Sequence, residues 1–174
     1  MWGRPTIRRR GRSCDVRRTN LRISVAGGGV SLRLSGTFPV MLTGRCECEA
    51  VGYTVADEFE AAYICHCSNC RALTGSAFLP WGEIEPRKLT FTSGTDSLLV
   101  AGDADAMHAT RCAQCSSLLC WTVEHHDRTW LRVPYGTLRE APTLKPTAHM
   151  FVGSKAEWYE ICDELPQYDT YPWS

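Results

Sequence analysis

The sequence predicts a small, mainly β protein with very little helix. Apolar residues alternate at a period of two in several short segments, and turn-forming Gly, Pro, Asp and Ser residues separate those segments. No ten-residue stretch shows a helical period. Seven of the ten cysteines gather in three tight clusters, a pattern typical of metal sites that staple small β domains. At 174 residues and 44% hydrophobic composition, the chain is long enough for one ordinary core.

The expected strands follow from the alternation, taken in chain order. They comprise residues 51–55 after the first cysteine cluster, 89–91 before a turn at Ser93-Gly94, 119–123 after the third cluster, and 130–133. One helical turn is expected over residues 68–73, directly after the second cluster, with Ser68 or Asn69 as its N-terminal cap.

The first forty residues differ from the rest in composition. Nine arginines stand there against the single acid Asp15, and the apolar periodicity is weak. We expect residues 1–40 to be a basic, disordered extension that lies upstream of a natural start at Met41 and is not native coding sequence. A targeting or twin-arginine export segment around Arg17-Arg18 is the alternative interpretation. Residues 41–174 then form the domain.

The charge of the domain argues against nucleic acid as a partner. Residues 41–174 carry ten basic and eighteen acidic side chains, whereas nucleic-acid-binding domains cluster Lys and Arg to neutralise phosphates. No segment has the 18 or more apolar residues that a membrane helix requires, so no membrane partner is expected. We expect a cytoplasmic protein, where reducing conditions keep cysteines available as ligands. The oligomeric state stays open, and a homo-oligomer is one possibility.

The spacing of the cysteines favours metal ions over disulfides. Disulfide frameworks spread cysteines through a chain, while pairs one or two residues apart aim their sulfurs at one ion. Zinc is the expected metal because thiolates are soft ligands, and none of the clusters has a ferredoxin spacing. The clusters are Cys46-x-Cys48, Cys65-x-Cys67-x-x-Cys70 and Cys112-x-x-Cys115.

Seven ligands divide naturally into four and three. A structural zinc has four protein ligands, and a catalytic zinc has three with one position left for water or substrate. Cys65, Cys67 and Cys70 lie within six residues and are the candidate open site. The candidate closed site is then formed by the two outer pairs, Cys46, Cys48, Cys112 and Cys115. Other partitions, such as one ion shared between the first two clusters, stay open.

The cluster motifs and their flanks resemble one known family, the glutathione-dependent formaldehyde-activating (GFA) enzyme and centromere protein V family. The resemblance covers residues 41–174. The matching motifs are Gly44-Arg45-Cys46-Glu47-Cys48, Cys65-His66-Cys67-Ser68-Asn69-Cys70-Arg71, Cys112-Ala113-Gln114-Cys115, Phe91-Thr92-Ser93-Gly94, Tyr135-Gly136-Thr137-Leu138, and residues 149–158 leading to Leu165-Pro166. One departure is Ser116, where the family usually has glycine, so an altered turn is expected beside the structural site.

The resemblance implies a Mss4-like β-tent with two zinc ions, in which the outer pairs hold the structural zinc and the central triad holds the catalytic one. It also implies carbon–sulfur lyase or synthase chemistry, the addition of glutathione to formaldehyde to give S-hydroxymethylglutathione or the reverse. Glutathione is then the co-substrate, and a small thiol and an aldehyde are the partners. The alternative is a non-catalytic zinc scaffold or interaction module, because one fold hosts several functions.

Beside the triad, two side chains are candidates for contact with substrate. His66 titrates in the right range for a proton shuttle, although a supporting or surface position is an equal interpretation. Arg71 has the paired donors that bind a glutathione carboxylate. At the triad itself, an all-thiolate zinc is a weak Lewis acid, so we expect it to activate the thiol and not the aldehyde carbonyl.

Overall fold

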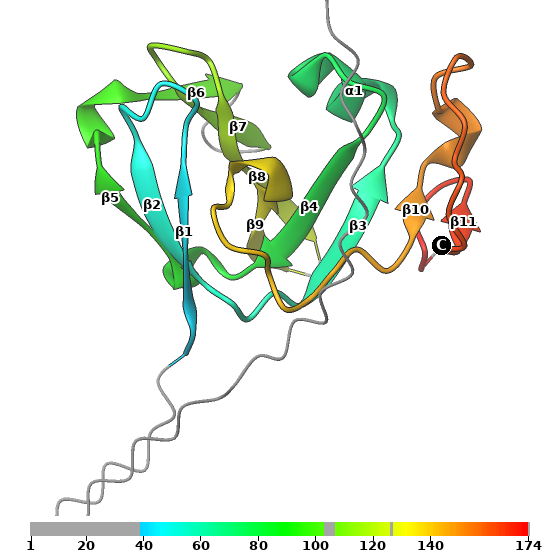
Figure 1. Ribbon diagram of the computed structural model, residues 1–174, viewed down its shortest axis with the longest axis horizontal. Helices are drawn as coiled ribbons and strands as arrows, with labels where there is room; N and C mark the ends of the chain where they lie inside the picture. The colour runs from blue at the N-terminus through cyan, green and yellow to red at the C-terminus, as the bar shows by residue number, and fades with distance from the viewer. Residues whose placement is uncertain (1–38, 103–106, 126, 174) are drawn as a thin grey trace, which may run out of the picture. The chain divides into compact units, whose positions relative to one another are not determined.

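The computed structural model describes residues 39–102, 107–125 and 127–173 of the chain (Figure 1). The expectation of a disordered extension therefore concerns residues that lie almost entirely outside the described ranges and stays a prediction. The first strand begins at Met41, the residue at which the domain was expected to start. No helix in the described ranges has the length and apolar character needed to span a bilayer.

The strands form two sheets, and the mainly β class is confirmed. A three-stranded antiparallel sheet has the order β1-β2-β5, and its members are β1 (Met41–Arg45), β2 (Gly52–Ala56) and β5 (Leu89–Ser93). The larger sheet has eight strands in the order β11-β10-β3-β4-β9-β8-β7-β6. Its members are β3 (Ala61–Cys65), β4 (Leu79–Ile84), β6 (Leu98–Gly102), β7 (His108–Cys112), β8 (Leu118–His125), β9 (Arg128–Pro134), β10 (His149–Met150) and β11 (Gln167–Tyr168).

The predicted strands all lie in these sheets. Residues 51–55 fall on β2 with one residue before it, 89–91 on β5, 119–123 on β8 and 130–133 on β9. The alternation predicted which residues face inward, since Val51, Tyr53 and Val55 are all buried. The turn after β5 is also present, with Gly94 in the left-handed conformation at a φ of 68°.

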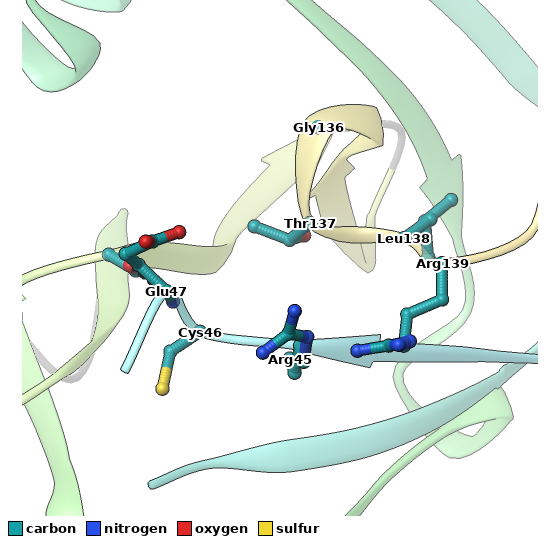
Figure 2. A pocket seen from close by; sticks show the side chains of 8 residues that line it. Arg45, Cys46, Glu47, Gly136, Thr137, Leu138 and Arg139 are labelled. Carbon is teal, nitrogen blue, oxygen red and sulfur yellow. Dashed lines mark hydrogen bonds between the residues drawn. The ribbon is translucent and has the colours of Figure 1, made fainter. Parts of the chain in front are cut away.

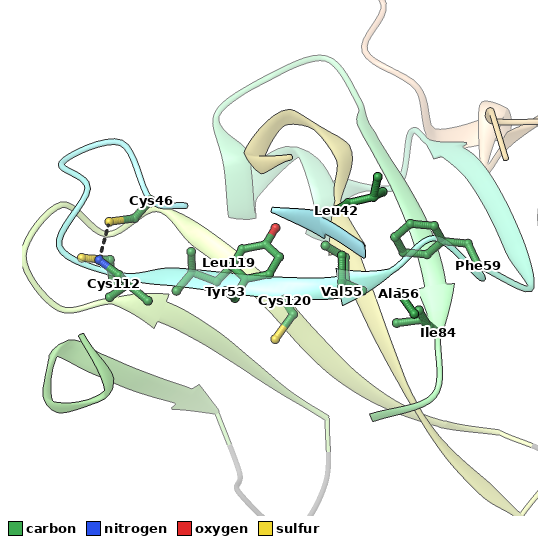
Figure 3. Close-up of a cluster of buried hydrophobic side chains, with 12 residues drawn as sticks. Leu42, Cys46, Tyr53, Val55, Ala56, Phe59, Ile84, Cys112, Leu119 and Cys120 are labelled. Carbon is green, nitrogen blue, oxygen red and sulfur yellow. Dashed lines mark hydrogen bonds between the residues drawn. The ribbon is translucent and has the colours of Figure 1, made fainter. Parts of the chain in front are cut away.

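One buried cluster lies between the small sheet and the strands β8 and β9 (Figure 3). Tyr53 is at its centre, and its hydroxyl lies 2.7 Å from the Thr137 hydroxyl. The hydroxyl-bearing end of the Tyr53 ring lies so close to Gly44 that any side chain there would overlap it. This close approach brings β1 and β2 together just before the first cysteine pair, because Cys46 follows Gly44 by two residues.

A second buried cluster lies under the central triad. It contains three tryptophans, Trp81, Trp121 and Trp130, with Met150 from β10. The rings of Trp81 and Trp121 meet edge to face with centroids 6.0 Å apart. Aromatic rings bury large apolar areas in rigid arrangements, so this cluster is a firm base for the loop above it.

The α-helix α1 (Ser68–Thr74) confirms the expected helical turn but corrects its cap. The N-terminal cap is Cys67, not Ser68 or Asn69, and the Cys67 Sγ atom accepts a hydrogen bond from the Cys70 N–H at 3.3 Å. The helix ends at Gly75, which has a φ of 65°. Within the described ranges there are also four short 3₁₀ turns: η1 (Pro86–Lys88), η2 (Thr95–Ser97), η3 (Tyr135–Thr137) and η4 (Val152–Ser154). Figure 1 shows α1 directly beyond the end of β3.

Candidate functional site

The two outer cysteine pairs come together at one point, as the four-plus-three division predicted. The sulfurs of Cys46, Cys48, Cys112 and Cys115 all lie within 4.8 Å of one another. The Sγ atom of Cys48 is 3.6 Å from that of Cys46 and 3.8 Å from that of Cys112. Because zinc–sulfur bonds are about 2.3 Å long, the sulfurs of a tetrahedral site lie about 3.8 Å apart. The cluster therefore fits a four-coordinate zinc ion.

Two similar turns hold these pairs. In the first, the backbone N–H of Glu49 donates to the Cys46 carbonyl, and in the second that of Ser116 donates to the Cys112 carbonyl at 2.9 Å. In both turns the residue directly after the second cysteine is left-handed, with φ values of 64° at Glu49 and 61° at Ser116. This explains why glycine suits position 116, since it adopts positive φ without steric cost. Ser116 keeps the left-handed turn against its intrinsic preference.

The electrostatics of the turn favour a thiolate at Cys115. The Ser117 hydroxyl lies 3.2 Å from the Cys115 sulfur. This contact, together with the backbone N–H groups of Cys48 and Ser117, lowers the pKa of Cys115 to about 5. A deprotonated sulfur is the form that binds zinc.

The central cysteines form a second group, separate from the first. The sulfurs of Cys65, Cys67 and Cys70 lie within 4.8 Å of one another, and no fourth Cys, His, Asp or Glu among the described residues joins them. Cys65 ends β3, Cys67 caps α1 and Cys70 lies in its first turn. A soft donor set of three thiols fits a zinc ion with one position left open.

Contacts among the three thiols favour a negative charge on one of their sulfurs. Contacts from the thiols of Cys65 and Cys70 lower the pKa of Cys67 to about 2. The contact with Cys67 raises the pKa of Cys65 to about 11, and contacts with Cys65 and Cys67 raise the pKa of Cys70 further. One sulfur of the triad is therefore held as a thiolate by the other two, ready to bind a cation.

The triad lines a cavity of about 730 Å³, within the size range of small-molecule sites. Most of the lining is apolar, and the polar side chains include Asn69, His108, Arg111 and Arg132 beside the three cysteines. Arg111 donates to the carbonyls of Ser116 at 2.8 Å and Leu73 at 2.9 Å, which ties α1 to the turn of the closed cluster. The triad thus combines an incomplete ligand set with space for a substrate.

His66 lies away from this cavity. Its side chain is fully buried and is not part of the cavity lining. The Nε2 atom of His66 is 2.8 Å from Nδ1 of His149, whose own Nε2 is 3.0 Å from the Asp163 carboxylate. Burial, with smaller contributions from His149 and Lys155, lowers the pKa of His66 to about 4. His66 is therefore neutral at physiological pH and is packed as a support for the ligand loop.

Sequence reasoning missed the partners of His66. His149 was noted as part of a resembling motif but was given no role. Its apolar neighbours Ala148 and Met150 are the sequence signal that favours a buried position for it, and both are buried in the structure. Asp163 lies in an irregular segment before β11, and nothing in the local sequence distinguishes it from the other acids there.

Arg71 faces the loop after β10. Its Nη2 atom donates to the Ser154 carbonyl at 3.1 Å, and the residue is not part of the cavity lining. The Nε atom is buried and has no hydrogen-bond partner among the described residues. Buried donors are usually paired, so this unpaired N–H is an exception among the described residues.

A second hollow, of about 350 Å³, lies beside the closed cluster (Figure 2). It is lined by Arg45, Arg139, Thr137 and neighbours, and Figure 2 shows the Cys46 sulfur directed away from Thr137. Arg45 forms an ion pair with Glu49. None of the triad cysteines lines this hollow, so it is not where chemistry at an open metal position would occur.

The comparisons with known proteins agree with the resemblance in the sequence. A family model described as glutathione-dependent formaldehyde-activating enzyme (GFA) matches residues 41–154. The chain belongs to the GFA family. The matched region contains both cysteine groups, and it ends before the last twenty residues of the chain.

The family assignment rests on this match alone. None of the curated proteins matches the chain. Among solved structures, a crystal structure of a Rhodobacter sphaeroides protein is similar, with 19% identity and a TM-score of 0.47. The similarity covers 58% of this chain and 91% of that one.

Proposed function

We propose that this GFA-family protein is a zinc-dependent carbon–sulfur lyase or synthase that joins a thiol to an aldehyde carbon and catalyses the reverse cleavage. Glutathione and formaldehyde, with S-hydroxymethylglutathione as their adduct, are the substrates that the family name suggests. The observation that carries the proposal is the three-thiol group at the wall of a substrate-sized cavity, with no fourth protein ligand among the described residues. A scaffold role would instead favour a triad closed by a further side chain.

The cysteines of the triad would hold the zinc ion, and the other four would hold the structural one. Zinc bound at the triad would act as a Lewis acid that lowers the pKa of a substrate thiol toward neutral pH. The Cys70 N–H donates to Cys67 Sγ and the Val51 N–H donates to Cys46 Sγ at 3.2 Å, so the backbone fixes one sulfur in each group. Such contacts to the ligands orient them and moderate their charge.

Residues around the cavity can stabilise the reacting groups. Arg111 lines the cavity, and no ion pair in the described ranges neutralises its charge. A guanidinium group held by backbone carbonyls is suited to stabilise the negative charge that develops on the aldehyde oxygen. Arg132, by contrast, is neutralised by Glu83 at 2.9 Å.

Two side chains have roles that the geometry refines. We assign His66 to positioning the ligand loop, because burial and its bond to His149 favour support over proton transfer to a substrate. We assign Arg71 to a carboxylate of glutathione, because its buried Nε–H has no described partner. Arg71 is not part of the cavity lining, so this contact would involve the end of the tripeptide farther from its thiol.

The test combines metal analysis with exchange NMR on mixtures of formaldehyde and glutathione. The zinc-loaded protein is expected to speed adduct exchange, and Cys67→Ser is expected to abolish that effect and lower the zinc content. Cys162→Ser is the matched control, because this exposed cysteine belongs to neither group. Full zinc and full activity in Cys67→Ser would end the proposal. Two zinc ions without any rate enhancement in the wild type would favour a scaffold.

A further inference from the structure

Three aromatic residues are part of the lining of the cavity beside the triad, and we call them the aromatic wall. It consists of Trp121 from β8, Phe151 after β10 and Tyr171 from the C-terminal segment. The rings of Phe151 and Tyr171 meet edge to face with centroids 4.7 Å apart. Tyr171 is 39% exposed, whereas Trp121 is buried beneath the cavity surface. Exposed aromatic surface inside a pocket is typical of a site for an apolar ligand group.

The backbone holds Phe151 in an unusual conformation to form this wall. Phe151 has a φ of 59° and a ψ of 37°, the left-handed region, which a bulky residue rarely adopts. Its N–H donates to the Thr170 carbonyl at 3.1 Å, and its carbonyl accepts from the Ser154 N–H at 3.2 Å. Disfavoured conformations persist where the surrounding structure enforces them, and they cluster at ligand sites. The ring is therefore placed by the fold and not by local preference.

The C-terminal segment fixes Tyr171 through further rings. Tyr171 stacks on Trp173 with centroids 5.0 Å apart. Trp173 in turn stacks on His125 at 6.3 Å and contacts Tyr63 at 5.8 Å. This segment follows the end of the family match at residue 154, so the outer part of the wall is not part of the matched GFA region. A wall built partly from residues outside the matched region is suited to set specificity and not the common chemistry.

Neither formaldehyde nor glutathione is well suited to such an apolar wall. Formaldehyde has no carbon substituent to pack on it. Glutathione is a hydrated tripeptide with two carboxylates and an ammonium group, and no Asp or Glu among the described residues lines the cavity to pair the ammonium. Burying apolar area is what this wall offers a ligand. The group that such a wall can contact is then a substituent on the carbonyl carbon of the aldehyde.

We infer that the aromatic wall of Trp121, Phe151 and Tyr171 is a subsite for an aldehyde that carries an aromatic ring. This inference rests on the proposed function and specifies the electrophile. The thiol sulfur forms a bond to the carbonyl carbon, the carbonyl π electrons move to oxygen, and the proton released by the thiol ends on that oxygen. The adduct is a hemithioacetal, and the step needs no oxidant or reductant.

Binding is tested without turnover, using benzyl alcohol as an unreactive probe in saturation-transfer NMR. Phe151→Gly removes one ring at a position whose φ suits glycine, and Tyr171→Ala removes the other. Each is expected to weaken benzyl alcohol binding by about tenfold, equivalent to about 1.4 kcal/mol. Tyr168→Ala is the matched control, because Tyr168 is an exposed tyrosine of the same segment outside the cavity lining. If Phe151→Gly does not fold, Tyr171→Ala still decides the question.

Turnover is compared with glutathione plus benzaldehyde or formaldehyde. The wild type is expected to have a higher kcat/KM for benzaldehyde than for formaldehyde. In both wall variants, the ratio of kcat/KM for benzaldehyde to kcat/KM for formaldehyde is expected to fall by about tenfold. Turnover of formaldehyde without benzyl alcohol binding would overturn the aromatic subsite and leave the proposed function standing. Binding that responds to the wall variants, with neither aldehyde turned over, would overturn the proposed function and leave only a site for an aromatic ring, not for an aldehyde.

Discussion

The Nε2 atom of His66 lies 2.8 Å from the Nδ1 atom of His149, and both rings are buried. His149 belongs to β10, which pairs in parallel with β3, the strand that ends at Cys65. The Asp163 carboxylate contacts the far side of His149 at 3.0 Å. The loop that carries the triad is therefore anchored to two segments from the C-terminal part of the chain.

Removal of His149 should weaken this anchor. His149→Ala leaves the buried Nε2 atom of His66 without a partner, which costs about 1–3 kcal/mol of unfolding free energy. Urea unfolding at pH 7.5 with excess zinc measures the effect. Asp169→Asn, a change at an exposed acid nearby, is expected to leave stability unchanged. Equal stability of His149→Ala and the wild type would show that the contact does not support the fold.

The low pKa of His66 predicts an acid-sensitive stability. Between about 6.5, the unperturbed pKa, and about 4, the unfolded chain binds a proton at His66 and the folded protein does not. The unfolding free energy should therefore fall as the pH drops through this window, by roughly 1–3 kcal/mol. The contribution is fully present above about pH 6.5.

The profile is checked by urea unfolding from pH 7.5 to pH 4.5 with zinc in excess. His66→Gln removes this titration but keeps an amide that can bond to His149, so its profile should be flatter than that of the wild type. Loss of zinc at low pH affects both proteins alike. Parallel profiles would rule out His66 as the source of the slope.

The two cysteine groups should differ in what they contribute to stability. Cys112→Ser removes a ligand from a cluster that joins turns 64 residues apart in sequence. The free energy of metal binding at this cluster contributes directly to the stability of the fold. We expect it to lower the unfolding free energy by several kcal/mol. Cys67→Ser affects a group contained within six residues and should lose one zinc ion with a smaller loss of stability.

Zinc content and thermal midpoint are measured together for these variants. Cys162→Ser should match the wild type in both, since its thiol is exposed and outside the two groups. A larger loss of stability in Cys67→Ser than in Cys112→Ser would reverse the assignment of structural and open sites.

Glycine at position 116 should stabilise the domain. Ser116 has a φ of 61°, and relief of the left-handed strain in Ser116→Gly is worth about 1 kcal/mol. This corresponds to a rise of about 3 °C in the thermal midpoint. Ser117→Gly is the contrasting change, because the Ser117 hydroxyl accepts from the Glu47 N–H at 3.0 Å and lies beside Cys115. It should lower the midpoint, and equal effects of the two changes would contradict the strain argument.

The strands and the metal groups could be predicted because their signals are local. Alternation predicted that Tyr53 and Val55 of β2, and Val51 directly before it, are buried, and the spacing of the triad let its sulfurs converge from one loop. The four-cysteine group joins distant turns, and its composition followed from coordination chemistry once the triad was set apart. Both groups depend on a few residues with fixed spacing.

The remaining parts of the site depend on contacts between distant segments. His66 and His149 are separated by 83 positions, and no local pattern relates them. The cap of α1 was predicted as Ser68 or Asn69 from general preferences, whereas the ligand Cys67 takes that place because its sulfur already points at the first turn. The ring of Tyr171 reaches the cavity through packing of the C-terminal segment, which periodicity does not report.

The sulfur of Cys67 is both a candidate ligand and the cap of α1. This helix has seven residues, well below the about 12–15 that an isolated helix needs to persist in water. Its order should therefore be thermodynamically linked to zinc at the triad, so that each favours the other. Since Asn69, Cys70 and Leu73 of α1 also line the cavity, loading of the metal and assembly of the substrate pocket would be a single event.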